Sequence, residues 1–295
     1  MFSLFEKTTS CSKLLLDIEQ LLIHYPAAIN ETDVNGCSVL HRLCFNDLTE
    51  TEKLVDLVNL LIIGGCFLNL QNNKGNTALM EASNCNNLNM CDMLVQSGAN
   101  INVRNYNGRT SLMMACTQSN DAIVQILING NANNKADLDI QDDNGNTALM
   151  FSIQKSSAYI YMILVRFDAD VNIQNKYNDT VLTIACRNGY LLIIQSLIQT
   201  THTKLNIQNQ DGDTPLMVAI KNNHEPAVEL LIRANVDLNI QNKKGNTALI
   251  IASKQKNNSI MQKLIKTKAD QTIKNNKGKT ACSYDDSNLL YCMLF

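Results

Sequence analysis

The chain has 295 residues, of which 45% are hydrophobic and 18% are charged, and its formal net charge is −2. This apolar content is enough for a substantial core, while the near-neutral charge points to no particular partner. No apolar stretch of about 18 residues occurs and the N-terminus lacks the basic segment of a secretory signal, so we expect neither a membrane span nor a signal peptide.

Ten cysteines are scattered along the chain without a CxxC pair. We interpret them as free thiols that serve as small hydrophobic side chains in a reducing compartment, which predicts a cytoplasmic protein. The histidines fall in different parts of the chain without metal-ligand spacing: His24, His41, His202 and His224. We therefore expect no metal, no cofactor and no small-molecule substrate.

An eight-residue segment recurs along the chain. NKGNTALM at residues 73–80 returns as DNGNTALM at 143–150 and KKGNTALI at 243–250, with looser copies between and after them. The threonine of each copy, or a serine in the first, gives eight phase marks: Ser38, Thr77, Thr110, Thr147, Thr180, Thr214, Thr247 and Thr280. Their spacings are 39, 33, 37, 33, 34, 33 and 33 residues, which indicates a repeat protein with a period of 33.

Each copy predicts a turn followed by two helices. A glycine lies at the turn, where a positive φ costs glycine little, and Asn178 takes this place in the fifth copy. The threonine that follows can cap the first helix. A second apolar stripe, which ends in an aliphatic pair such as Leu127 and Ile128, predicts the partner helix. Neither helix pair can bury its apolar face alone, so neighbouring copies must stack.

The pattern resembles the ankyrin repeat, D-x-x-G-x-T-P-L-H-x-A followed by a second helix and G-A-D-V-N, from about residue 12 to the C-terminus. The resemblance implies an all-α ankyrin-repeat solenoid of about eight stacked units, each a β-turn and a helix-turn-helix. We predict a degenerate N-terminal capping half-repeat at 1–33, with a helix over 12–23. Seven repeats at 34–274 and a capping repeat at 275–295 would complete one continuous domain.

The TPLH tetrapeptide of the family is degraded here. Proline survives only as Pro215 and histidine only as His41, and methionine replaces the histidine in four copies: Met80, Met113, Met150 and Met217. In the family this histidine helps to bond adjacent repeats. We expect packing by flexible methionines to take over that role.

Two polar insertions and an apolar tail depart from the period. The insertions lie at residues 46–52 and 131–135, and both predict longer surface loops, with functional contact loops as the alternative. The tail at residues 283–295 predicts a final helix that folds onto the seventh copy. A dimer contact or a partner-binding tail is the alternative.

The resemblance also implies a binding surface, because in this family the turn tips and the exposed ends of the first helices line a concave groove. Large aromatics stand out at these tips, where we expect no structural gain from them, and Tyr and Arg are enriched in interface hot spots. We predict that a partner binds to eight residues in and around these tips: Tyr106, Arg109, Tyr177, Asp179, Arg187, Asp213, Lys243 and Lys244.

A second candidate surface is basic. From residue 240 to residue 280 there are ten lysines and one acid, Asp270. This end could attract nucleic acid or an anionic membrane, although the stretch has no aromatic residue for base stacking. A solubilising surface is the plainer interpretation.

The sequence therefore predicts a non-catalytic scaffold or adaptor that binds a partner protein in its groove, and no enzyme. The alternative is charge-driven binding through residues 240–280. We expect a monomer. The copies are rich in Asn, Ile and Lys and resemble ankyrin-repeat proteins of giant DNA viruses, protists and intracellular bacteria. This resemblance suggests an effector that binds host factors in the host cytoplasm.

Overall fold

The computed structural model describes Gln20, His24 and residues 29–45, 51–131, 134–154 and 158–284, with the backbone alone for 45 and 51–54. It divides into two compact units, Met1–Ala169 and Asp170–Phe295, each of which is described by itself. The predicted N-terminal helix and the predicted final helix lie mostly outside the described residues. The predicted boundaries and the single continuous domain stay predictions.

Short helices in sequential pairs make up both units. The first unit contains α3 (Val39–Phe45), α4 (Thr51–Ile63), α5 (Ala78–Asn84), α6 (Leu88–Gln96), α7 (Ser111–Gln118), α8 (Asp121–Asn129), α9 (Ala148–Ser152) and α10 (Ala158–Arg166). The second contains α11 (Val181–Asn188), α12 (Leu191–Gln199), α13 (Pro215–Lys221), α14 (Glu225–Arg233), α15 (Ala248–Lys254), α16 (Asn258–Lys266) and the 3₁₀ helix η2 (Ala281–Tyr284). No β-strand occurs in these described segments.

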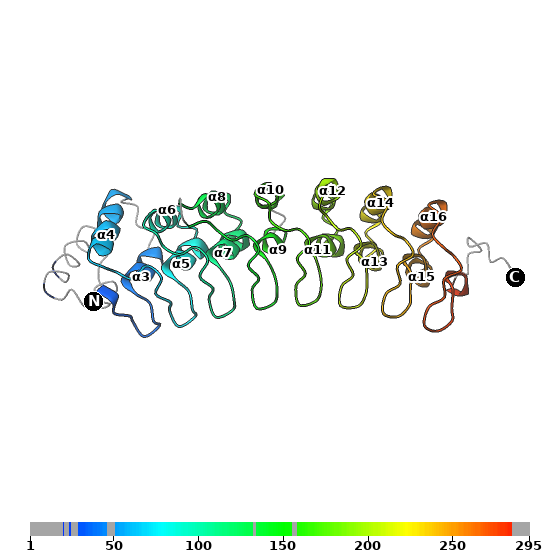
Figure 1. The fold of residues 1–295 in the computed structure, drawn as a ribbon, viewed down its shortest axis with the longest axis horizontal. Helices are drawn as coiled ribbons and strands as arrows, with labels where there is room; N and C mark the ends of the chain where they lie inside the picture. Colours follow the sequence, from blue (N-terminus) through cyan, green and yellow to red (C-terminus); the bar gives the residue numbers. More distant parts are fainter. Residues whose placement is uncertain are drawn as a thin grey trace. The chain divides into compact units, whose positions relative to one another are not determined.

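Within each unit the helices pack in two rows. In the second unit α11, α13, α15 and η2 contact one another in order, and α12, α14 and α16 form the other row. The first unit repeats this scheme with α3, α5, α7 and α9 in one row. Figure 1 shows the loops between pairs as fingers that extend from the row of first helices in each unit. The predicted pairing of helices is confirmed.

The helix caps predicted for the copies are also confirmed from the second copy to the seventh. The threonine before each first helix from α5 to α15 accepts a hydrogen bond from the backbone N–H three residues later, as in Thr77 Oγ1 with the Met80 amide at 3.3 Å. Each such cap contributes about 1 kcal/mol of helix stability. Asn178 has a φ of +55° where the other copies have glycine, so the fifth finger keeps the shape of the rest.

The methionines that replace the family histidine are buried, with relative exposures of 0–1%. They pack in the core between neighbouring first helices, as expected. His41 keeps the family role, because its Nε2 lies 2.8 Å from the Asn76 carbonyl oxygen in the next copy. The Ser38 amide donates to Nδ1, so Nε2 carries the proton and donates.

Much of the second insertion is tied to the preceding repeat. Asn131 donates from Nδ2 to the Val95 carbonyl at 3.0 Å, and Asn134 donates to the Ala99 carbonyl at 2.6 Å. These bonds give the insertion a structural role on the second-helix side. Most of the first insertion, residues 46–50, lies outside the described residues.

Seven cysteines of the described part of the chain carry free thiols: Cys37, Cys44, Cys66, Cys85, Cys91, Cys116 and Cys186. Burial raises the pKa of the Cys91 thiol to about 12, and it raises the pKa values of Cys116 and Cys186 further. These thiols therefore stay protonated and serve as small hydrophobic side chains, as expected. Among the described residues, no helix is long and apolar enough to cross a bilayer.

Candidate functional site

Each finger is held in shape by an Asn or Asp side chain at its base. In the sixth copy Asn209 Oδ1 accepts hydrogen bonds from the backbone amides of Asp211 and Asp213, both at 3.0 Å. This Asx turn fixes the tip of the finger, because the side-chain oxygen accepts from backbone amides that would otherwise lack a hydrogen-bond partner within the turn. The same two bonds occur at Asn72, Asn105, Asp142, Asn175, Asn242 and Asn275.

The amide group of the same side chain reaches back to the preceding finger. Asn209 Nδ2 donates to Asp179 Oδ1 at 3.3 Å, and Asn242 Nδ2 donates to Asp213 Oδ1 at 2.7 Å. Corresponding bonds join Asn105 to Asn76 and Asn275 to Asn246. We name this series the asparagine ladder. It is buried, and it supplies the side-chain bonding between repeats that the lost histidine provides elsewhere in the family.

The ladder corrects one part of the predicted surface. Asp179 and Asp213 follow the turn and were expected to face the groove, but each is 2% exposed. Their carboxylates instead point into the stack, where they accept from the next finger and pair with a basic residue on the first helix of their own copy. They are therefore buried rather than part of the exposed surface, and each holds a basic side chain in place.

Arg187 is held in this way. Its two terminal nitrogens lie 2.8 Å from the two carboxylate oxygens of Asp179, a bidentate ion pair. The Arg187 side chain remains 41% exposed, whereas the Asp179 side chain is 3% exposed. Such a pair fixes the arginine in one geometry, since the planar fork matches the carboxylate. In the next copy Lys221 takes the place of Arg187 and pairs with Asp213 through its single ammonium nitrogen.

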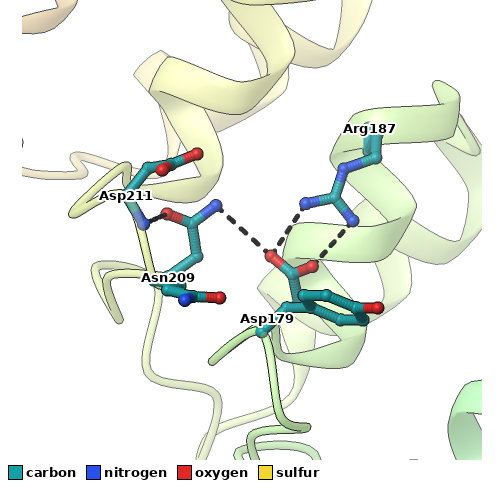
Figure 2. Close-up of a pocket in the computed structure, with 6 residues that line it drawn as sticks. Asp179, Arg187, Asn209 and Asp211 are labelled. Atoms are coloured by element: carbon teal, nitrogen blue, oxygen red, sulfur yellow. Dashed lines mark hydrogen bonds and ion pairs between the residues drawn. The ribbon is translucent and has the colours of Figure 1, made fainter. Parts of the chain in front are cut away.

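An open pocket of about 290 Å³ lies beside this ion pair, within the second unit. Its lining residues are Tyr177, Asp179, Arg187, Asn209, Gln210 and Asp211. Figure 2 shows Arg187 and Asn209 converging on Asp179 from two neighbouring copies. Tyr177 is 63% exposed, and its carbonyl accepts a hydrogen bond from the Gln210 amide at 2.8 Å. The pocket therefore combines an exposed aromatic ring with a fixed guanidinium.

The two candidates in the first unit have structural contacts. The ring of Tyr106 lies against the turn of the preceding finger, where a Cβ added to Gly75 would meet its Cδ1 at 2.6 Å. The expectation that a tip gains nothing structural from an aromatic ring is therefore wrong here, although Tyr106 is 68% exposed. Arg109 lies 4.8 Å over the Phe151 ring and 3.8 Å from Asp142 Oδ2.

The structure thus brings together three of the eight predicted residues, Tyr177, Asp179 and Arg187, in one pocket. Asp213 lies in the next copy, and Lys243 and Lys244 are exposed at the finger after that. Tyr106 and Arg109 belong to the first unit and are not part of this pocket. Asn209 was missed, although a recurring I-Q-N tripeptide before the finger could have indicated it.

The same tripeptide supplies a second set of bonds. Gln241 donates from Nε2 to the Gly245 carbonyl at 2.7 Å and to the Lys274 carbonyl of the next copy at 3.0 Å. Gln71, Gln174 and Gln208 bond in the same way. Uncharged glutamine side chains therefore make several of the hydrogen bonds between neighbouring fingers.

Helix pairs joined by Asx-braced fingers define a helical repeat protein. Comparison with known protein families identifies which kind of repeat this is. The family described as ankyrin repeats (three copies) matches residues 9–105, 49–137, 131–208 and 188–275. The chain belongs to this family, and its fold is the all-α ankyrin-repeat solenoid.

The solved structures agree with this assignment. The ankyrin repeat domain of Bcl-3, a member of the IkappaB protein family, has a similar fold with a TM-score of 0.55 and 22% sequence identity. The match covers 86% of this chain and 96% of that one. Comparison with curated protein sequences gives no match. Ankyrin repeats are in general non-catalytic modules for binding other proteins.

Proposed function

We propose that this protein is an interaction scaffold that binds a segment of a partner protein along the fingers and first-helix ends of the fifth and sixth copies. The observation that carries the proposal is the pocket at Tyr177, Arg187 and Asp211. An exposed ring beside a braced guanidinium is the combination of residue types that dominates binding energy in protein interfaces.

The geometry supports binding at low entropic cost. Arg187 is fixed by two bonds to Asp179, and Asp179 is fixed in turn by Asn209. A partner therefore does not have to order these side chains, which saves about 0.5–1.5 kcal/mol for each long side chain already held in place. Remaining N–H groups of Arg187 can donate to carbonyl or carboxylate oxygens of the partner.

The test compares two exposed tyrosines. The tagged protein and the variants Tyr177→Ala and Tyr159→Ala are used to purify partners from the native or host cell, with quantification by mass spectrometry. Tyr159 is 56% exposed on α10 and does not line the pocket, so it is the matched control. We expect at least one partner that Tyr159→Ala retains and Tyr177→Ala loses. The Tyr177 anchor is worth about 2 kcal/mol, or about thirtyfold in Kd.

Equal retention of every partner by both variants would refute the assignment of the pocket. Thermal unfolding of both variants serves as the folding control. We use Tyr177 rather than Tyr106, because the ring of Tyr106 also covers the turn at Gly75 and its removal would perturb the stack itself.

A second candidate function is charge-driven binding through the Lys-rich end, because nine of the ten lysines between 240 and 280 are exposed. The tenth, Lys263, is paired with Glu225 and Glu229. This function predicts binding to duplex DNA or to anionic vesicles that weakens steeply with salt. Absence of binding to both at low salt would dispose of it.

The resemblance to Asn-rich ankyrin proteins supports a more specific proposal, an effector that binds host factors in the host cytoplasm. We also propose a monomer, with a dimer through residues 285–295 as the alternative. Light scattering of the full chain and of a chain that ends at Tyr284 separates these two states. A dimer that persists without the tail would contradict both.

A further inference from the structure

The first helices of the second unit end in a row of basic residues whose pairing changes along the stack. Arg187 and Lys221 are neutralised by the buried carboxylates of Asp179 and Asp213. In the seventh copy the same position after the turn is Asn246, and its Oδ1 accepts from Lys254 Nζ at 3.0 Å. An amide carries no charge, so the positive charge of Lys254 is not offset by a carboxylate at this position, as those of Arg187 and Lys221 are.

A second lysine and a tyrosine join Lys254 at this point. The ammonium groups of Lys254 and Lys279 lie 4.9 Å and 5.3 Å over the ring of Tyr284. Asn275, the last member of the asparagine ladder, donates to the Tyr284 hydroxyl oxygen at 3.3 Å. The Asn275 bond and the two lysines lower the pKa of Tyr284, which agrees with a positive potential at the cluster.

No acidic side chain between residues 240 and 284 neutralises this cluster. The one acid in that range, Asp270, accepts from the Thr272 amide and hydroxyl within its own turn at 2.8 Å and 2.7 Å. The balance of charge also differs between the first and the second part of the sequence. Residues 1–169 contain ten basic and seventeen acidic residues, whereas residues 170–295 contain fifteen basic and ten acidic. The cluster therefore lies in the positive part of the chain.

We propose that Lys254, Lys279 and Tyr284 form a second binding site, which takes the carboxylates of an acidic segment of a partner protein. Two ammonium groups and a phenolic hydroxyl supply charge-assisted donors for two neighbouring carboxylates. Nucleic acid suits the site less well. Tyr284 is the one aromatic residue between 240 and 284, and its ring already carries two cation contacts, so no free ring faces a base. The site does not depend on the pocket at Tyr177.

The experiment measures the anisotropy of fluorescein-labelled hexaglutamate as the full-length protein is added at low salt, with hexaglutamine as the uncharged probe. The site variant is Lys254→Gln with Lys279→Gln. The matched control is Lys266→Gln with Lys268→Gln, which removes the same charge from two exposed lysines of the same end. All proteins also carry Asp285→Asn and Asp286→Asn, because these carboxylates follow Tyr284 and lie outside the described residues.

We expect hexaglutamate to bind, the site variant to lose about three- to tenfold in affinity and the control to lose less than twofold, since two exposed ion pairs are removed at the site. Tyr284→Phe keeps the ring and removes one donor, so it should weaken binding less than the double variant. Equal losses in the site variant and the control would mean binding by net charge alone, and this would overturn the proposal.

A duplex DNA probe completes the design. Tighter binding of DNA than of hexaglutamate, with the same loss in both double variants, would assign this end to nucleic acid and overturn the proposal. The site variant should still bind the partner that depends on Tyr177. Failure at one site therefore leaves the other assignment standing.

Discussion

The bidentate ion pair between Arg187 and Asp179 predicts that removing the arginine lowers the free energy of unfolding more than neutralising the aspartate does. Asp179→Asn keeps the side-chain volume and an acceptor for Asn209, and the arginine it releases is 41% exposed and can be hydrated. The seventh copy already has this arrangement, with Asn246 beside Lys254. We expect Asp179→Asn to lower the free energy of unfolding by about 1 kcal/mol, as for a half-exposed charge pair.

Arg187→Met should cost more. It leaves a carboxylate that is 3% exposed without its cation, and the remaining side-chain partner is the Asn209 amide at 3.3 Å. Breaking a buried pair in this way typically costs 3–5 kcal/mol. Because this carboxylate keeps one bond and lies beside an open pocket, we expect about 2–3 kcal/mol.

The assay is urea unfolding followed by far-ultraviolet circular dichroism, with hydrogen exchange of the Asp179 and Thr183 amides as the local measurement. Hydrogen exchange is needed because repeat stacks can unfold in parts, so a single midpoint does not report the fifth copy alone. A cost for Asp179→Asn equal to or above that for Arg187→Met would refute the reasoning that the buried carboxylate is the costly partner.

Three further predictions concern other parts of the stack. Burial lowers the pKa of His41 below its usual 6.5, so its contribution to stability is complete above pH 6.5 and is lost as the pH falls; urea midpoints at pH 7.5 and 5.5 should differ more for the natural protein than for His41→Gln. Asn178→Val places a β-branched residue at a φ of +55° and should cost about 1–2 kcal/mol, whereas Asn178→Gly should change stability little. Iodoacetamide at neutral pH should modify the exposed Cys85 well before Cys91, whose thiol is buried with a pKa of about 12; equal rates would contradict the burial of Cys91.

The repeat, the capping threonines and the turn positions were predictable because they depend on neighbours within one copy. The direction of a side chain at a finger was not. Asp179 and Tyr106 both follow the family pattern for exposed positions, yet one points into the stack and the other covers the turn of the preceding copy. Both outcomes depend on a finger about 30 residues away, which sequence spacing places nearby but does not orient.

The asparagine ladder could not be predicted from the sequence for the same reason. Asn209 was visible as part of a recurring tripeptide, but its partner Asp179 lies 30 residues earlier. From the degraded tetrapeptide we expected packing by methionines to replace the histidine bond between repeats. The methionines are buried as expected, but the finger amides supply hydrogen bonds between copies that the resemblance did not indicate.

The asparagine and glutamine side chains that donate between the fingers carry no charge at any physiological pH, and in two bonds of the ladder the acceptor is an uncharged asparagine as well. Ionic strength should therefore leave much of the cohesion between copies untouched, whereas any contact made by the exposed lysines weakens as salt is added. Such a molecule can release a charged partner in response to a change in its surroundings and still keep its own architecture. The amide side chains between the fingers hold the repeats together, and different side chains, the exposed lysines, would make the contacts that depend on salt.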